Sequence, residues 1–195
     1  ECRNQRDKGI HNPKKSRKII CFKESCEIST HTLIMTTETP KNGLHTYYWY
    51  NFEDGQKEAE GHFKDGKEDG KWTWWYEDGQ KEKEVHYKDG ELHGKWTFWN
   101  EEGWLESVSN YKNDELDGKF VDWYANGQKL SEENYKDGKD HGKWTNWDEN
   151  GHIQYEINYK DGKRDGKLTE WDENGEISSE SNWKDGKCIG GDCPK

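Results

Sequence analysis

A 24-residue repeat is the feature that most limits what this chain can fold into. Two series of glycines recur at this interval without an insertion, over about six units that start near Thr46. The members of the first series are Gly70, Gly94, Gly118, Gly142 and Gly166, and the second runs from Gly55 to Gly175. A fixed period of this length is typical of stacked arrays, in which each unit packs only against its neighbours.

Each unit alternates two strand-like runs with two glycine-containing turns, as in the stretch "KDGKEDGKWTWWYEDGQ". Glycine supplies the positive φ angles that tight reversals between antiparallel strands need. We therefore predict an all-β fold: an elongated antiparallel sheet of about six stacked 24-residue β-hairpins with disulfide-tied ends. At two strand spacings per hairpin, six hairpins would span roughly 58 Å.

Aromatic side chains replace an aliphatic core, because the chain holds 12 Trp and 10 Tyr. They recur in columns, of which one is Phe63, Tyr87, Tyr111, Tyr135, Tyr159 and Trp183. Two further columns start at Trp72 and Trp75. Residues three apart in a strand point to opposite faces, so either the sheet carries aromatic rings on both faces or a bulge re-aims one column. The sequence leaves both alternatives open.

The charge pattern limits the class of partner. The net charge of -11 argues against binding nucleic acid or anionic lipid, which both require Lys and Arg. No apolar run approaches the roughly 20 residues of a membrane span, so we expect no direct membrane insertion. Residues 1–20 form a basic arm with seven basic and two acidic residues. This arm is either solvated or docked on an acidic surface, of this chain or of a partner.

Five cysteines flank the repeats. Cys21 and Cys26, and likewise Cys188 and Cys193, are spaced C-x4-C, which differs from the usual zinc spacing and predicts two local disulfides and no metal site. Cys2 stays unassigned. Disulfides at both ends predict an extracytoplasmic location (periplasm, cell surface or secreted), and the lack of an N-x-S/T sequon favours a bacterial source.

The expected organisation is therefore tripartite. Residues 1–45 form the basic arm and cap, residues 46–187 the hairpin array, and residues 188–195 the C-terminal cysteine cap. Carboxylates recur in every unit, in the turns and in columns that run along the array. A catalytic acid–base pair should instead occur once and lie in a pocket sheltered from solvent. Phosphate-loop and nucleophile motifs are absent from the sequence. We expect neither an enzyme nor a cofactor.

The column that starts at Trp74 is not uniform, since its members are Trp74, Phe98, Asp122, Asn146 and Glu170. Aromatic residues are thus concentrated in the first three units, and such patches often mark interfaces. The candidate partner-binding residues are Tyr48, Tyr50, Trp74, Trp75, Phe98, Trp99 and Trp104. The alternative is that these residues pack under the N-terminal arm.

The cassette "YKDGKxxGKWTxWxENG" resembles the MORN repeat variant family, over residues 46–187. The resemblance implies a sheet of successive hairpins that serves as a scaffold or partner platform, in bacterial envelope proteins and antitoxin-like proteins. The expected function is a non-enzymatic protein-binding scaffold in a bacterial envelope or surface assembly, with one or more protein partners. The alternatives are a surface protein that binds a glycan or a choline-like ligand through exposed Trp, and an antitoxin-like protein.

Overall fold

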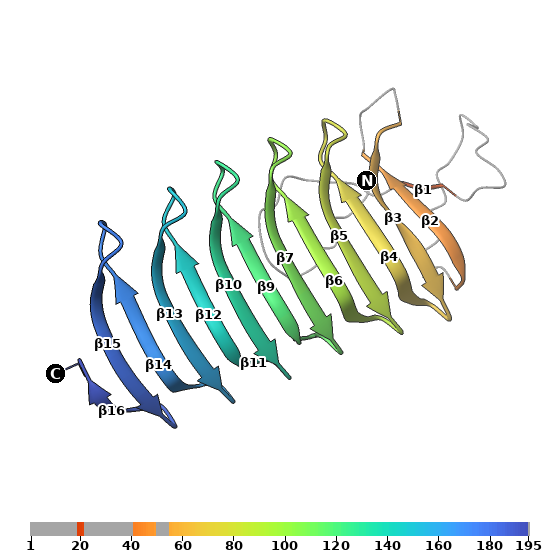
Figure 1. The fold of residues 1–195 in the computed structure, drawn as a ribbon. Helices are drawn as coiled ribbons and strands as arrows, with labels where there is room; N and C mark the ends of the chain where they lie inside the picture. Colours follow the sequence, from red (N-terminus) through yellow and green to blue (C-terminus); the bar gives the residue numbers. More distant parts are fainter. Residues whose placement is uncertain (1–18, 22–40, 50–54, 195) are drawn as a thin grey trace, which may run out of the picture.

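The computed structural model describes residues 19–21, 41–49 and 55–194, and within them the chain is all β. Sixteen strand segments form one sheet (Figure 1). They are β1 Ile19–Cys21, β2 Gly43–Tyr48, β3 Lys57–Lys64, β4 Lys67–Trp75, β5 Lys81–Lys88, β6 Glu91–Trp99, β7 Leu105–Lys112, β8 Glu115–Leu116, β9 Gly118–Trp123, β10 Lys129–Lys136, β11 Lys139–Asp140, β12 Gly142–Trp147, β13 Ile153–Lys160, β14 Lys163–Trp171, β15 Ile177–Lys184 and β16 Lys187–Gly191.

The strands follow one another across the sheet in chain order, and every pairing is antiparallel. The short segments β8 and β11 pair with β7 and β10, and they lead directly into β9 and β12. The result is an elongated single-layer ribbon with β1 at one end and β16 at the other (Figure 1). The predicted elongated array of hairpins is confirmed.

Two kinds of turn join the strands. Asp65 and Gly66 both have positive φ, at 51° and 80°, between the paired residues Lys64 and Lys67, which is the geometry of a two-residue primed turn. At the other end of the strands, between β4 and β5, the Gly79 amide donates to the Tyr76 carbonyl oxygen at 3.0 Å and closes a three-residue turn. Both turns repeat along the array, so successive hairpins keep one register.

The second glycine of each "KDGKxxG" stretch lies in a bulge rather than in the turn. Tyr87 pairs with Leu92 and Val85 pairs with Trp96, so one residue of β5 faces three residues of β6, among them Gly94 at φ 95°. A wide bulge leaves backbone polar groups without ladder partners, and these groups need other hydrogen bonds. Our sequence interpretation, which placed this glycine in the turn, was wrong on this point.

A clamp on both faces satisfies the bulge of the fourth unit, and parts of it recur in other units. The Asn134 side chain donates through Nδ2 to the Lys143 carbonyl oxygen at 2.6 Å. The Asn134 carbonyl oxygen accepts from the His141 amide at 2.8 Å and from the Trp144 indole Nε1 at 3.1 Å. Equivalent side-chain bonds join Asn110 to the Lys119 carbonyl, and the indole bond recurs from Trp72 to the His62 carbonyl. Asn and Trp act together in the fourth unit, whereas Phe120 and Leu168 replace the indole in two other units.

The first face of the sheet, here named the aromatic face, carries the Trp72 column. Trp72 is buried and packs edge-to-face on Phe63, with ring centroids 5.0 Å apart. Farther along, Tyr135, Trp144 and Tyr159 continue the contacts, with centroids 5.5 and 4.7 Å apart. Neighbouring units thus supply each other's contacts, as expected for an array in which no hairpin buries its own rings.

The opposite face, here named the ladder face, combines lysine, glutamate, threonine and the Trp75 column. Glu84 accepts from Lys71 at 2.7 Å and from Lys81 at 2.6 Å, and the buried Thr73 pairs with Glu84 across the strands. Lys57 Nζ lies 5.5 Å from the Trp75 ring centroid. The sequence left open whether the sheet carries rings on both faces or a bulge re-aims one column. Both apply, because rings occupy both faces and a register shift lies between Trp74 and Trp75.

The N-terminal end of the array begins before Thr46. Gly43 pairs with Phe63 as Gly70 pairs with Tyr87, which makes β2 the counterpart of β4. In this alignment the buried His45 takes the place of Trp72 and packs against Phe63, with ring centroids 5.3 Å apart. The first unit is thus a divergent repeat whose glycine and histidine keep the geometry.

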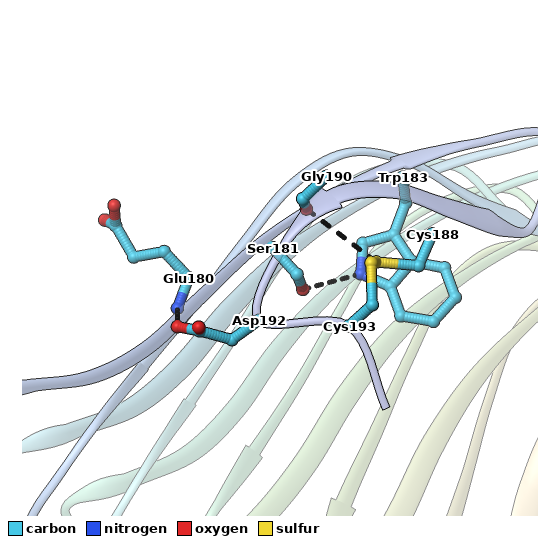
Figure 2. The surroundings of a disulfide bond; sticks show 7 residues. All are labelled: Glu180, Ser181, Trp183, Cys188, Gly190, Asp192 and Cys193. Carbon is cyan, nitrogen blue, oxygen red and sulfur yellow. Dashed lines mark hydrogen bonds between the residues drawn. A yellow bond between two sulfur atoms is a disulfide. The ribbon is translucent and has the colours of Figure 1, made fainter. Parts of the chain in front are cut away.

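A disulfide cap ends the array at β16. Cys188 and Cys193 are bonded, with Cα atoms 5.7 Å apart (Figure 2). Asp192 lies against the outer edge of β15: its amide donates to the Glu180 carbonyl oxygen at 2.7 Å, and its carboxylate accepts from the Glu180 amide at 3.1 Å. The Cys188–Cys193 prediction is confirmed, whereas Cys26 and the side chain of Cys21 lie outside the described residues.

The bulge geometry predicts that Gly142→Val lowers the free energy of unfolding by about 2 kcal/mol or more, because an L-residue is strained at φ 78°. Chemical denaturation measures the loss. Gly142→Asn is the matched control: Asn tolerates this conformation, and the added Cβ meets its nearest neighbour, Asn134 Cβ, at 3.6 Å. The Asn variant should lose less than half as much, and equal losses would contradict the bulge assignment.

The cap predicts a local rather than global effect of removing the disulfide. Cys188→Ser with Cys193→Ser opens a loop whose closure is worth about 2 kcal/mol in the chain-entropy description. Because units contact only their neighbours, hydrogen exchange should accelerate in β15 and β16 and stay unchanged in β9 and β10. Exchange that rises equally along the array would refute this account.

Candidate functional site

The seven candidate binding residues do not form one surface. Trp74 and Phe98 lie on the aromatic face, where each pairs with Lys83 from opposite sides. Trp75 and Trp99 directly follow them and lie on the ladder face. Tyr48 joins this second group, and Trp104 lies at the end of the turn before β7 with 56% of its surface exposed. Tyr50 is outside the described residues.

The tryptophans of the ladder face are covered by lysines of the array itself. Lys57 and Lys81 stand over Trp75 and Trp99 at 5.5 and 5.7 Å from the ring centroids. Their ammonium groups also bind Glu60 at 2.5 Å and Glu84 at 2.6 Å. Partial burial by itself raises the pKa of Glu84. The hydrogen bonds from Lys71 and Lys81 outweigh this effect and keep the pKa of Glu84 below its ordinary value. This face satisfies its own charges.

The aromatic face carries a continuous row of cross-strand neighbours from β2 to β15. Pairing in register runs through Tyr47, Ala59, Trp74, Lys83, Phe98, Ser107, Asp122, Ser131, Asn146, Tyr155, Glu170 and Ser179. Three of its four aromatic residues, Tyr47, Trp74 and Phe98, lie in the first half, and the second half is polar except for Tyr155. Strand pairing thereby converts the non-uniform column of the sequence into a gradient along one face.

The aromatic half of this row has a stepped ring surface. Tyr47 and Trp74 both stack on Trp72, with centroids 6.1 and 5.7 Å away. Lys83 Nζ lies 4.9 Å from the centroid of the Trp74 ring. Trp74 and Phe98 are partly exposed, because no second layer of strands or helices covers this face within the described residues. The geometry offers rings in fixed orientations to a binding partner.

An acidic group interrupts the row on β9 and β10. Burial first, and then the carboxylates of Glu133 and Glu106, raise the pKa of Asp122 to about 6. Tyr135 donates its hydroxyl to Glu133 at 2.6 Å, and burial together with this bond raises the pKa of Tyr135. Asp122 and Glu106 share the lining of a pocket of about 320 Å³, with Trp104 at its wall.

Sequence reasoning missed this acidic group, although its signal was present. Glu133 stands at a position that carries small or aliphatic residues in the other units, and Asp122, whose column is acidic again only at Glu170, belongs to the same unit. The pairing of Phe120 with Glu133 and of Asp122 with Ser131 brings the two acids to one face. Two unusual charges in one repeat should have been interpreted as neighbours.

Two further observations concern classes of site. Among the described residues, no group of three or more His, Cys, Asp or Glu side chains is arranged to hold a metal ion. Within the same residues, no helix has the length and apolar character needed to cross a bilayer.

The environment of Asp122 predicts a pH-dependent stability difference for Asp122→Asn. An acid whose folded-state pKa is raised destabilises the fold once it ionises, so the loss is absent below about pH 4 and complete above about pH 6. The groups that face Asp122 are Glu106 from β7, and Glu133 and Tyr135 from β10. Thermal unfolding should show the variant more stable than the wild type at pH 8, and equal to it near pH 3.5.

The control for this prediction is Glu170→Gln, which removes one charge from the same column in another unit. It should not reproduce the pH dependence. A constant difference for Asp122→Asn at all pH values would contradict the ionisation account.

Comparison with known proteins adds the family. A family model described as the MORN repeat variant matches five consecutive copies, over residues 68–89, 92–113, 116–137, 140–161 and 164–185. Each copy spans two strands and the three-residue turn between them, and together the copies cover more than half of the chain. No curated protein matches the chain significantly. The chain belongs to the MORN repeat variant family.

Proposed function

We propose that this protein is a non-enzymatic scaffold that binds a partner protein through the first half of its aromatic face. The supporting observation is the asymmetry of the two faces. On the ladder face, lysines cover the tryptophans and neutralise the glutamates, as at Lys81 between Trp99 and Glu84. On the aromatic face, Lys83 lies 4.9 Å from the Trp74 ring centroid but is only loosely paired, at 3.8 Å from Glu82, and within the described residues no cation stands over Phe98; both rings are partly exposed in one row. Aromatic side chains of this kind are enriched at the centres of protein interfaces.

The proposed location is extracytoplasmic, in a bacterial envelope or surface assembly. The Cys188–Cys193 bond supports an oxidising compartment, since such bonds are rare in reducing ones. An antitoxin-like role in the cytoplasm would require these cysteines to be reduced. The carboxylates of the ladder face are engaged by lysines, which supports a structural rather than a catalytic role for them.

A glycan- or choline-binding surface is the second candidate. Trp104 favours it, because an indole that is 56% exposed beside a pocket can stack on a sugar ring or on a quaternary ammonium group. The two candidates predict different bound molecules, and the same protein preparation can test both.

The scaffold proposal predicts face-specific cross-linking. A photoreactive phenylalanine placed at Phe98 should capture one protein in stoichiometric yield from an envelope extract of the source organism. The same probe at the adjacent Trp99 points to the opposite face and is the matched control. Trp74→Ala should weaken binding of the captured partner on the order of 30-fold, the effect of removing an interface hot spot.

Two results would overturn the scaffold proposal. Equal capture from positions 98 and 99 would mean that the aromatic face has no special role. Retention on insoluble cell-wall glycan with no protein captured, and loss of that retention in Trp74→Ala, would replace protein binding by ligand binding.

A further inference from the structure

The carboxylates of the two faces differ in their partners. On the ladder face, Glu132 binds Lys119 at 2.5 Å and Lys129 at 2.6 Å, and these bonds lower its pKa. On the aromatic face, Asp122 and Glu133 have no Lys or Arg within ion-pair distance among the described residues. The array can supply lysines to glutamates, yet these two acids are left without a cation.

Asp122 lies within the row, between Ser107 and Ser131, and lines the pocket of about 320 Å³ that we name the Asp122 pocket. Its walls come from β7 and the turn before it, from β9 and the turn after it, and from β10. The lining includes the acid Glu106, the aromatic residues Trp104 and Tyr124, and the aliphatic Leu130. Two carboxylates and an exposed indole therefore converge on one hollow.

Ser131 supplies an independent observation. This residue is 6% exposed, and its hydroxyl has no hydrogen-bond partner within the described part of the chain. Ser131 pairs directly with Asp122 on one side and with Asn146 on the other, so its side chain lies on the aromatic face beside Asp122. Buried hydroxyl groups normally have a partner. Ser131 borders the pocket through Asp122 without lining it, so it adds an unsatisfied polar atom beside an unpaired acid, and the group missing there is one that pairs with the carboxylates of the pocket.

The missing group must be a cation that donates several hydrogen bonds and tolerates an aromatic wall. A guanidinium group has five N–H donors and stacks on indole, and an ammonium group has three donors and also binds aromatic faces. We propose that the Asp122 pocket binds the arginine or lysine side chain of a basic segment on a partner protein.

The position of the pocket agrees with the proposed partner surface. Phe98, Ser107 and Asp122 are successive members of one row, so the pocket lies two strands, or about 9.6 Å, from the aromatic half. One extended partner segment can place an apolar residue on Trp74 and Phe98 and a basic residue in the pocket. The identity of the ligand as a partner's side chain rests on the proposed scaffold function, whereas its cationic chemistry does not.

A peptide titration of the full chain tests the pocket directly. The probe is the blocked pentapeptide Gly-Gly-Arg-Gly-Gly, followed by amide and indole NMR signals of the isotope-labelled protein. We expect saturable shifts at the Asp122 and Ser131 amides and at the Trp104 indole N–H. Asp122→Asn should weaken binding on the order of tenfold, the usual worth of a charge-assisted hydrogen bond. Its spectrum reports at the same time that the variant is folded.

Three controls decide the outcome. A peptide with citrulline in place of arginine keeps the shape without the charge and should not bind, and Glu170→Gln should bind the arginine peptide like the wild type. Equal binding of citrulline, or unchanged affinity in Asp122→Asn, would overturn the proposal. Choline chloride that binds more tightly than the arginine or lysine peptide would also overturn it, in favour of a small-molecule ammonium site.

The test is separable from that of the scaffold function. Peptide binding at Asp122 together with face-independent cross-linking would keep the cation pocket and reject the scaffold. Face-specific cross-linking without any peptide shift would do the reverse.

Discussion

The bulge clamp is the interaction on which the rest of the structure depends. At a bulge such as that at His86 one residue of a strand faces three of the next, and side chains bond to the backbone there. In the fourth unit the Asn134 amide binds the Lys143 carbonyl, and the Trp144 indole binds the Asn134 carbonyl. Without these bonds, exposed backbone groups would weaken the ladder at every unit. The clamp therefore explains why glycine and Asn or His recur at a 24-residue period, with Trp at the third position in most units and Phe120 or Leu168 in two.

The clamp also separates the roles of the two faces. The residue at each bulge sends its side chain to the ladder face, while the indole covers the bulge from the aromatic face. On the ladder face, lysines then bind glutamates and cover the second tryptophan column, as Lys129 does with Glu132 and Trp147. A face that satisfies its own charges and rings has little left to offer a partner. Binding is therefore expected on the aromatic face, where the residues vary from unit to unit.

The sequence was sufficient for the period, the hairpins and the Cys188–Cys193 bond, because glycine turns and local cysteine spacing are short-range signals. It could not separate turn glycines from bulge glycines, since Gly66 and Gly70 both adopt positive φ for different reasons. The sequence analysis also did not recognise β2, which begins at Gly43, as a divergent repeat strand, because His45 replaces the tryptophan there. The Asp122 pocket needs cross-strand register, and register joins residues that a column analysis keeps in separate units.

The side chains of the row can differ from unit to unit because the array packs in one dimension. Each unit contacts only its neighbours, so a substitution at one row position leaves distant clamps intact. Trp74, Phe98, Asp122, Asn146 and Glu170 share one backbone position and differ in chemistry. Asp122 even retains a destabilising ionisation that a neutral residue would avoid. A fold that accepts such different residues at this position gives no structural reason for an unpaired, partly buried acid, and that mismatch is the argument for assigning it to binding.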